Sequence, residues 1–241
     1  MREHLDTMPI WEAYRAGCEC PLCEIRQKNE AMYIDNFLGA SVMEPDTRVE
    51  VNQKGFCQRH FAQMFVASNR LGLALMTHTY MKETIDRLQK SETAPQKGGL
   101  FRRSAPAPKN DAQAAVESCI LCERLEHTME RYVYTLLYMY EHEKAFRDAF
   151  ATSKGLCLPH YFQVMQDAPR HLSGKMLEEF SQTAMRVERE NLARVEKDLE
   201  WFTLKFDYRN QQKPWGNSRD ALERTVNRLR GFCVGGGEMQ E

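Results

Sequence analysis

A cysteine–histidine pattern that occurs twice constrains this chain more than any other feature. CPLC at 20–23 is followed by GFCQRH at 55–60, and CILC at 119–122 is followed by GLCLPH at 155–160. The residues around the two copies also match when the motifs are aligned. A motif that recurs at matched spacing is typical of internal repeats, so we interpret the pattern as duplication of one unit.

Each motif has the residue types and the spacing of a metal-ligand pair. The turn of C-x-x-C brings two sulfurs to the same side, and C-x-x-H at the first turn of a helix places positions i and i+3 on one face. Three thiolates and one imidazole form the closed tetrahedral shell of a structural zinc site. With one site per repeat, the predicted ligands are Cys20, Cys23, Cys57 and His60, then Cys119, Cys122, Cys157 and His160. Spacing alone leaves open an exchange of ligands between the repeats.

Two zinc ions per chain are the expected cofactors, because zinc prefers a mixed thiolate and imidazole ligand set. An iron–sulfur cluster is the alternative, since three cysteines and one histidine can also hold one. Cys18 is not expected to be a ligand, because Glu117 occupies its position in the second copy. Cys233 has no cysteine or histidine near it and is also expected to lie outside the sites.

Composition limits the other function classes. The 33 basic and 34 acidic residues of the 241-residue chain nearly cancel, so nucleic acid is a possible but not a favoured partner. The sequence shows no secretory signal and no run long enough to span a membrane. We therefore expect a cytoplasmic protein, without a membrane partner. In that reducing compartment the cysteines are expected to bind metal and not to form disulfides.

The hydrophobic periodicity predicts a mainly α, pseudo-symmetric fold in which a helical unit is duplicated and a C-terminal helix is added. Long helices are predicted over 21–37, 71–90, 119–141 and 171–206, with shorter ones over 142–151 and after Cys57 and Cys157. The segment 41–55 is predicted to be a loop with a possible short extended piece. The expected organisation is a first repeat over 1–92, a flexible linker over 93–113, a second repeat over 114–210, and a loop, short helix and tail over 211–241.

The C-terminal segment 206–231 differs in character from the repeats. Pro214 and Gly216 indicate a turn, and Asn217 or Ser218 is expected to cap the helix that follows. Trp215 is expected to pack against the long helix. A second interpretation is that Tyr208, Arg209 and Trp215 form a ligand or partner contact, because tryptophan and arginine dominate binding hot spots.

Several motifs together resemble a known family. CPLCE, KGFCQRHF, KGLCLPH, DLEWFTLKFDYRN and KPWGNSRDAL are similar to those of uncharacterised bacterial proteins that share a domain of unknown function, mostly from anaerobic Gram-positive bacteria. The resemblance spans nearly the whole chain and implies the paired Cys/His motif. It implies no activity.

The sequence favours a non-catalytic zinc-binding helical protein with two structural sites that acts as a protein-interaction or regulatory module. An iron–sulfur or thiol-based redox sensor is the alternative. Catalysis is less favoured, because metal-bound cysteine and histidine cannot also serve as nucleophile and base, and a closed shell leaves no position for water.

Overall fold

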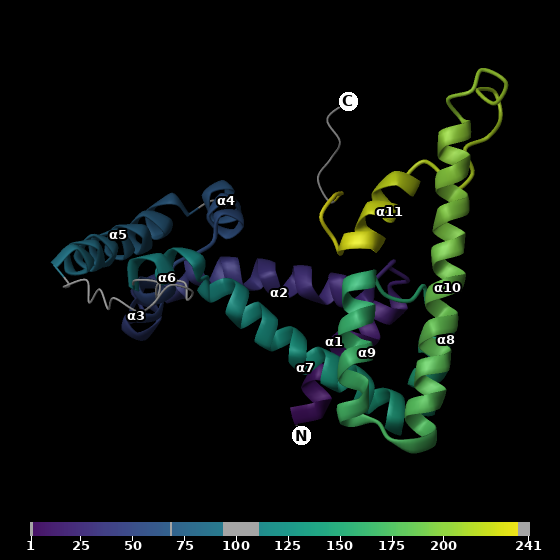
Figure 1. The fold of residues 1–241 in the computed structure, drawn as a ribbon, viewed down its shortest axis with the longest axis horizontal. Coiled ribbons are helices and arrows are strands. Elements are labelled where there is room, and N and C mark those ends of the chain that lie inside the picture. The colour runs from purple at the N-terminus through teal and green to yellow at the C-terminus, as the bar shows by residue number, and fades with distance from the viewer. Residues whose placement is uncertain (1, 68, 94–110, 236–241) are drawn as a thin grey trace, which may run out of the picture. The chain divides into compact units, whose positions relative to one another are not determined.

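The computed structural model describes residues 2–67, 69–93 and 111–235 (Figure 1). Over these residues the chain forms eleven α-helices and one 3₁₀ turn, with no strand. The predicted helical class is therefore confirmed. No helix among the described residues combines the length and the hydrophobicity that a membrane span requires. Residues 94–110 of the predicted linker lie outside the described ranges.

The chain divides into two compact units, which we name by their order along the sequence. The inner unit comprises residues 28–127, and the outer unit comprises residues 1–27 and 128–241. Each unit therefore combines residues from both predicted repeats. The boundaries fall within the helices α2 (Pro21–Leu38) and α7 (Ile120–His142).

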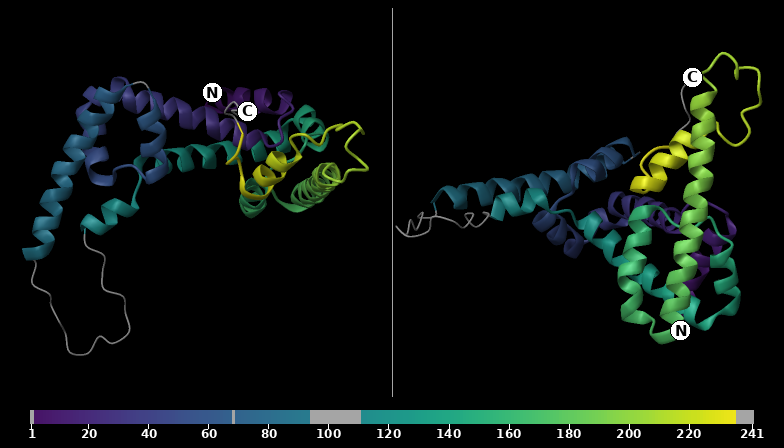
Figure 2. Two further views of the ribbon diagram at one scale, coloured as in Figure 1. Left: turned by 90° about the horizontal axis from the view of Figure 1, so that it is seen from above. Right: turned by 45° about the vertical axis from the view of Figure 1, so that its right-hand side comes forward.

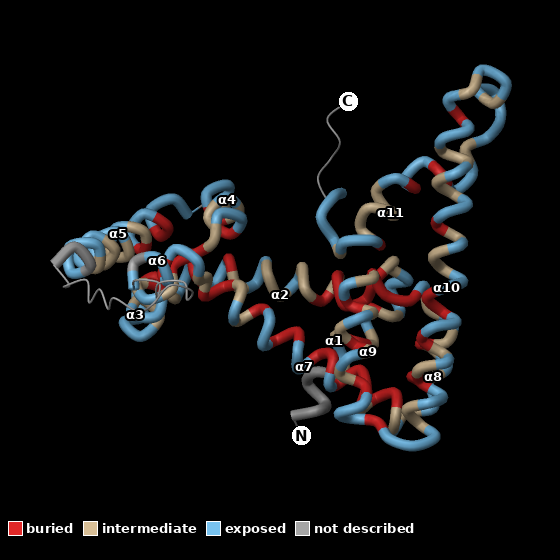
Figure 3. The backbone as a smooth tube through the Cα atoms, viewed as in Figure 1, coloured by how far each residue is buried: buried red, intermediate tan, exposed pale blue. Residues whose placement is uncertain are grey.

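The outer unit is built around the second part of α7. Its other complete helices are α1 (Arg2–Arg15), α8 (Lys144–Ala151), α9 (Leu158–His171), α10 (Gly174–Leu204) and α11 (Ala221–Arg230). α10 packs against α8, α9 and α11. With 31 residues it is the longest helix that the structure describes, and the right view of Figure 2 shows it along its length. Buried aromatic residues join these helices: the ring of Tyr140 on α7 lies 5.5 Å from Phe150 on α8 and 4.8 Å from Phe180 on α10. The aromatic run at 132–140 thus belongs mainly to the core (Figure 3).

The inner unit has its own smaller core. Its complete elements are the 3₁₀ turn η1 (Ala40–Met43) and the helices α3 (Pro45–Lys54), α4 (Gln58–Val66), α5 (Arg70–Thr93) and α6 (Asp111–Glu117). α5 packs against α3, α4 and α6. Val51, Met64 and Met76 are buried among these helices together with the edge-to-face pair Phe37 and Phe56.

The prediction of a loop over 41–55 was wrong for most of that segment, because residues 45–54 form α3. Pro45 occupies the first turn, where a missing N–H costs little, and the acidic Asp46 lies near the positive end of the helix. Gly55, with φ of 60°, ends the helix. The helix buries Val51 against the inner core, which stabilises it despite its polar composition.

The C-terminal turn also differs in detail from its prediction. The residue that precedes α11 is Asp220, and neither Asn217 nor Ser218 caps this helix with its side chain. Ser218 is instead buried and donates a hydrogen bond to the carbonyl oxygen of Trp215 at 2.7 Å. Phe206, the last residue of the helix predicted over 171–206, follows the end of α10 and is exposed.

Candidate metal centres

The eight predicted ligands form two clusters of four, but the pairing differs from the prediction of one site per repeat. The outer cluster consists of Cys20, Cys23, Cys157 and His160, and the inner cluster of Cys57, His60, Cys119 and Cys122. Each C-x-x-C pair thus meets the C-x-x-H pair of the other copy. This is the exchange of ligands that spacing left open. It follows the division of the chain, since each cluster lies within one unit.

All four motifs share one local geometry. The carbonyl oxygen of the first cysteine accepts a hydrogen bond from the backbone N–H four residues later, so that this cysteine is the residue immediately before a helix. The second ligand, three residues further on, lies on the same side of the first helical turn. The helices concerned are α2 and α9 at the outer cluster and α7 and α4 at the inner cluster. Two positive helix ends therefore converge on each cluster, which favours thiolate over thiol.

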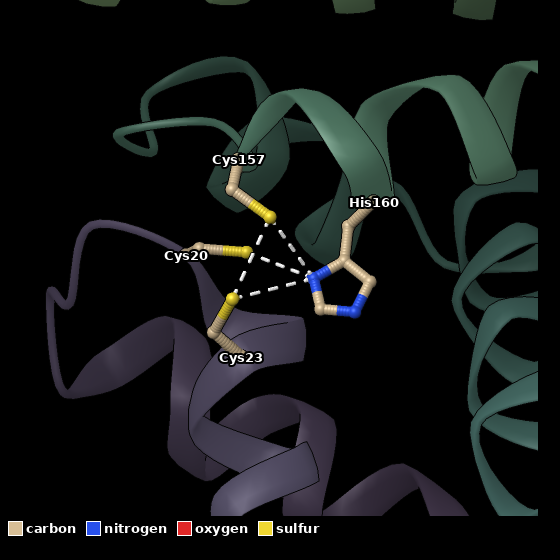
Figure 4. Close-up of side chains that lie close together, drawn as sticks. All are labelled: Cys20, Cys23, Cys157 and His160. Carbon is tan, nitrogen blue, oxygen red and sulfur yellow. Dashed lines mark hydrogen bonds between the residues drawn. The ribbon is translucent and has the colours of Figure 1, made fainter. Parts of the chain in front are cut away.

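The outer cluster brings three sulfurs and one imidazole nitrogen together (Figure 4). His160 directs Nδ1 at the three sulfurs, with distances of 3.4 Å to Cys20, 3.4 Å to Cys23 and 3.2 Å to Cys157. The sulfurs of Cys23 and Cys157 lie 3.5 Å apart. All four side chains are buried, and Cys157 is only 1% exposed.

The sulfurs of the outer cluster differ in proton affinity. Hydrogen bonds from Cys20 and Cys23, together with the nearby charge of Arg228, lower the pKa of Cys157 to about 4. The hydrogen bonds to Cys157 and Cys20 and burial raise the pKa of Cys23. The sulfur of Cys157 is thus a thiolate that accepts hydrogen bonds from the neighbouring thiols. A divalent cation can take the place of the thiol protons.

The inner cluster has the same ligand arrangement in a more open setting. Nδ1 of His60 lies 3.2 Å from the sulfur of Cys57, 3.2 Å from Cys119 and 3.4 Å from Cys122. The three cysteines are only half-buried, whereas His60 is fully buried. The opposite ring nitrogen, Nε2, lies 2.9 Å from the Glu30 carboxylate. A carboxylate on the second nitrogen of a ligating histidine fixes the tautomer and the ring orientation.

In the inner cluster, His60 and Cys119 favour opposite charges, a protonated imidazole and a thiolate. Burial opposes the charged form of His60, but hydrogen bonds to Cys119 and Glu30 outweigh it and raise its pKa to about 9. Burial likewise opposes ionisation of Cys119, but the hydrogen bond from His60 lowers its pKa to about 6. Burial and the neighbouring Cys119 raise the pKa of Cys122 to about 12.

Both clusters have the dimensions of a site for a single ion. The four ligand atoms of each lie within 4.8 Å of one another. Zinc–sulfur bonds of about 2.3 Å and zinc–nitrogen bonds of about 2.0 Å imply edges of roughly 3.5–3.8 Å for a tetrahedron. The closest distances, 3.2–3.7 Å, are near these values. The residues present therefore fit a tetrahedral metal ion.

The remaining predicted residues lie outside the clusters. Cys18 and Cys233 belong to neither, as expected, and the eight cysteines, which all lie in the described ranges, form no disulfide. Cys18 lines a cavity of about 270 Å³ together with Cys20, Cys23 and Cys157 of the outer cluster. Tyr208 and Arg209 lie on the exposed loop after α10, where Arg209 pairs with Asp207 at 2.6 Å. Trp215 is half-buried and its ring lies 5.8 Å from Phe202 of α10, which agrees with the expected packing against the long helix.

The sequence did not reveal two residues that support the clusters. Glu30 lies near the middle of α2, and its contact with His60 depends on tertiary structure. Arg228 is 1% exposed, although its helix α11 carries many charged residues. The apolar face of α11 indicates that one side of this helix is buried, but this was only a weak signal for the burial of Arg228.

Two clusters of three cysteines and one histidine on an all-helical scaffold define a class of helical proteins with paired candidate metal centres. Within that class, the chain belongs to a family of unknown function, DUF6062, whose model matches residues 1–235. This match confirms the predicted resemblance to an uncharacterised family. No curated protein and no solved structure matches the chain.

Proposed function

We propose that the protein is a non-catalytic helical protein with two structural zinc sites, one at each cluster, and that it acts as a protein-interaction or regulatory module. The observation that carries this proposal is the convergence of four ligand atoms within 4.8 Å at both clusters. Two independent copies of one ligand set, each built from segments far apart in the chain, are difficult to explain by packing of thiols alone.

Zinc suits these clusters better than an iron–sulfur cluster. A multi-iron cluster places inorganic sulfide and several irons between its cysteines. All four ligand atoms of each cluster lie within 4.8 Å of one another, which leaves room for one ion only. Three thiolates and one imidazole satisfy the tetrahedral preference of zinc.

A structural role agrees with the position of the ligands in the chain. A zinc ion at the outer cluster would join residues 20–23 to residues 157–160, and an ion at the inner cluster would join residues 57–60 to residues 119–122. Metal binding at such a site contributes directly to folding, because the unfolded chain does not hold the ligands together. Four protein ligands also leave no open position for a substrate. Free cysteine ligands suit a reducing compartment such as the cytoplasm.

The loop that follows α10 has features that favour a protein as the partner. Tyr208 is 80% exposed and Phe206 72% exposed. Their loop is nevertheless held in place, since the buried ammonium of Lys205 donates hydrogen bonds to the carbonyl oxygens of Asn210, Gln211 and Lys213. Exposed aromatic residues on an ordered loop bind at low entropic cost. With Arg209 beside them, they have the composition of a binding hot spot.

Elemental analysis and a visible spectrum of anaerobically purified protein test the zinc assignment. We expect two zinc ions per chain and no visible absorption. Cys57→Ser and Cys157→Ser should each lose one ion, whereas Cys18→Ser, the matched control beside the outer cluster, should keep both. Iron with sulfide and a coloured protein would support the redox alternative, and a metal-free protein would contradict the proposal.

The partner class is tested separately by a gel-shift assay with single- and double-stranded nucleic acids over a range of salt concentrations. We expect no salt-sensitive binding, because phosphate recognition requires an excess of positive charge. Binding that weakens steeply with salt and is lost in Arg209→Ala would replace the protein partner with a nucleic acid.

A further inference from the structure

Arg228 on α11 is a deeply buried cation near the outer cluster. It is 1% exposed, although α11 is a short helix with a largely polar sequence. A guanidinium is costly to bury unless its donors are paired, so the position requires an explanation from its contacts.

The contacts of Arg228 reach both ligand segments of the outer cluster. Nη1 donates a hydrogen bond to the carbonyl oxygen of Glu19 at 2.8 Å, immediately before Cys20. Nη2 donates to the carbonyl oxygen of Lys154 at 2.6 Å, three residues before Cys157. One planar guanidinium therefore spans the two segments whose cysteines converge.

Glu188 on α10 completes this arrangement. Its carboxylate lies 3.5 Å from Nε of Arg228 and is 3.3 Å from the backbone N–H of Leu156, the residue before Cys157. The space for the pair comes from Gly155, which has φ of 77°: a Cβ atom there would lie 3.0 Å from both Arg228 and Glu188. The glycine of the second G-x-C-x-x-H motif thus provides both the turn and the room for a buried ion pair.

Charge also favours a cation at this position. Three thiolates and one divalent ion would carry a net negative charge, which a nearby cation stabilises. Arg228 supplies a positive charge beside the two ligand segments that it joins.

The inner cluster joins its ligand segments without such a residue. Ser118, next to Cys119, donates a hydrogen bond to the carbonyl oxygen of Lys54 at 2.7 Å. The N–H of Ile120 donates to the carbonyl oxygen of Gly55 at 3.1 Å. These contacts come from the ligand segments themselves, so the inner cluster does not depend on α11.

We infer that Arg228 is a positioning residue of the outer metal centre: it holds the Cys20–Cys23 and Cys157–His160 segments at the separation at which their four ligands converge. The C-terminal helix α11 is thereby an integral part of that centre. This inference rests on the proposed function as a metal-binding protein and extends it by assigning the support of one site to a distant helix.

The test measures the rate at which a chromophoric chelator removes zinc from full-length protein that carries Cys57→Ser, so that only the outer centre is loaded. Arg228→Met should accelerate release by roughly 10- to 100-fold, the usual effect of losing a residue that orients metal ligands. Arg228→Lys should release zinc at a rate between those of Arg228→Met and the parent. Its ammonium keeps the positive charge but cannot reach both carbonyl oxygens as the planar guanidinium does.

Arg224→Met is the matched control on the same helix. Arg224 contacts Asp198 of α10 at 3.0 Å and none of the four ligand segments, so this variant should release zinc at the parental rate. In the complementary Cys157→Ser protein, Arg228→Met should leave release from the inner centre unchanged. Cobalt-loaded samples and far-UV circular dichroism report whether the tetrahedral site and the helices persist.

Parental release rates in both Arg228 variants would overturn the inference, as would equal acceleration in the Arg224 control. If Arg228→Met does not fold, Arg228→Lys alone decides the question by the same comparison. Failure of the proposed function is distinguishable, because then the unmodified protein itself would contain no zinc.

Discussion

The outer and inner clusters have the same four ligand types and differ in what surrounds them. The outer sulfurs are buried and supported by an ion pair from two other helices, Arg228 of α11 and Glu188 of α10. The inner sulfurs are half-exposed, and their support is local except for Glu30, which orients His60. When Cys20 is aligned with Cys119, the residue that corresponds to Glu30 is Met129, which is buried in the outer core.

This comparison teaches that a repeated ligand motif need not give two equivalent sites. The motif specifies the local turn at the start of each helix, whereas the neighbours of that turn come from elsewhere in the chain. We expect the outer centre to be protected by burial and the inner centre to depend on the orientation of its histidine. The predictions below test this difference.

The largest expected effect is the response of the inner centre to pH. His60, with a pKa of about 9, and Cys122, with a pKa of about 12, carry protons at neutral pH, whereas Cys119, with a pKa of about 6, is already ionised. A metal ion must displace at least the protons of His60 and Cys122. Its apparent affinity should therefore rise at least about 100-fold per pH unit between pH 6.5 and 8.5. Acidification over this range therefore favours release.

Zinc-buffered competition titrations of Cys157→Ser at three pH values measure this slope. A pH-independent affinity, or a slope of about one proton or fewer per ion, would contradict the assigned protonation of His60 and Cys122.

A smaller effect is expected from alanine at the two motif glycines. Gly55 has φ of 60°, and a Cβ atom there would lie 2.5 Å from the ring of Tyr80, whereas at Gly155 the nearest atoms, at 3.0 Å, are the ends of two side chains. Gly55→Ala should therefore lower the free energy of unfolding of the inner unit by about 2–4 kcal/mol, and Gly155→Ala should cost the outer unit less.

Urea unfolding followed by circular dichroism measures both glycine variants. Tyr80→Ala added to Gly55→Ala removes the clash but not the backbone strain, so the double variant should lose less stability than the two single changes together. A Gly55→Ala protein as stable as the parent would refute the close packing against Tyr80.

The smallest effect concerns Glu30. Replacing its carboxylate in Glu30→Gln weakens the hydrogen bond at Nε2 of His60, and we expect about a 10-fold loss of zinc affinity at the inner centre. The outer centre of the same chain is the internal control and should be unaffected. Competition titrations on the Cys157→Ser and Cys57→Ser backgrounds separate the two sites, and an equal loss at both would show that Glu30 acts through general stability.

Much of the local structure is predictable from the sequence because its causes are local. Apolar periodicity located the long helices, and the cysteine and histidine spacing identified all eight members of the clusters. The signals of α3 were also local but were overlooked: Pro45 and Asp46 are typical of a helix start, and Gly55 after Lys54 is typical of a helix end.

The pairing of the motifs was not predictable, because each C-x-x-C can complete a tetrahedral site with either C-x-x-H. The choice depends on which helix starts face each other in the folded units. The same limit applies to Arg228 and Glu30, whose partners lie far from them in the sequence. Spacing within a motif carries no information about such contacts.

The pairing of each C-x-x-C with the C-x-x-H of the other copy is tested most directly by native mass spectrometry, which counts metal ions in two double variants. If Cys20 and Cys157 belong to one site, Cys20→Ser/Cys157→Ser removes one ion and leaves the other. Cys20→Ser/Cys57→Ser then damages both sites and should contain none. The opposite result, no ion in the first variant and one in the second, would establish one site per repeat and contradict the pairing described above.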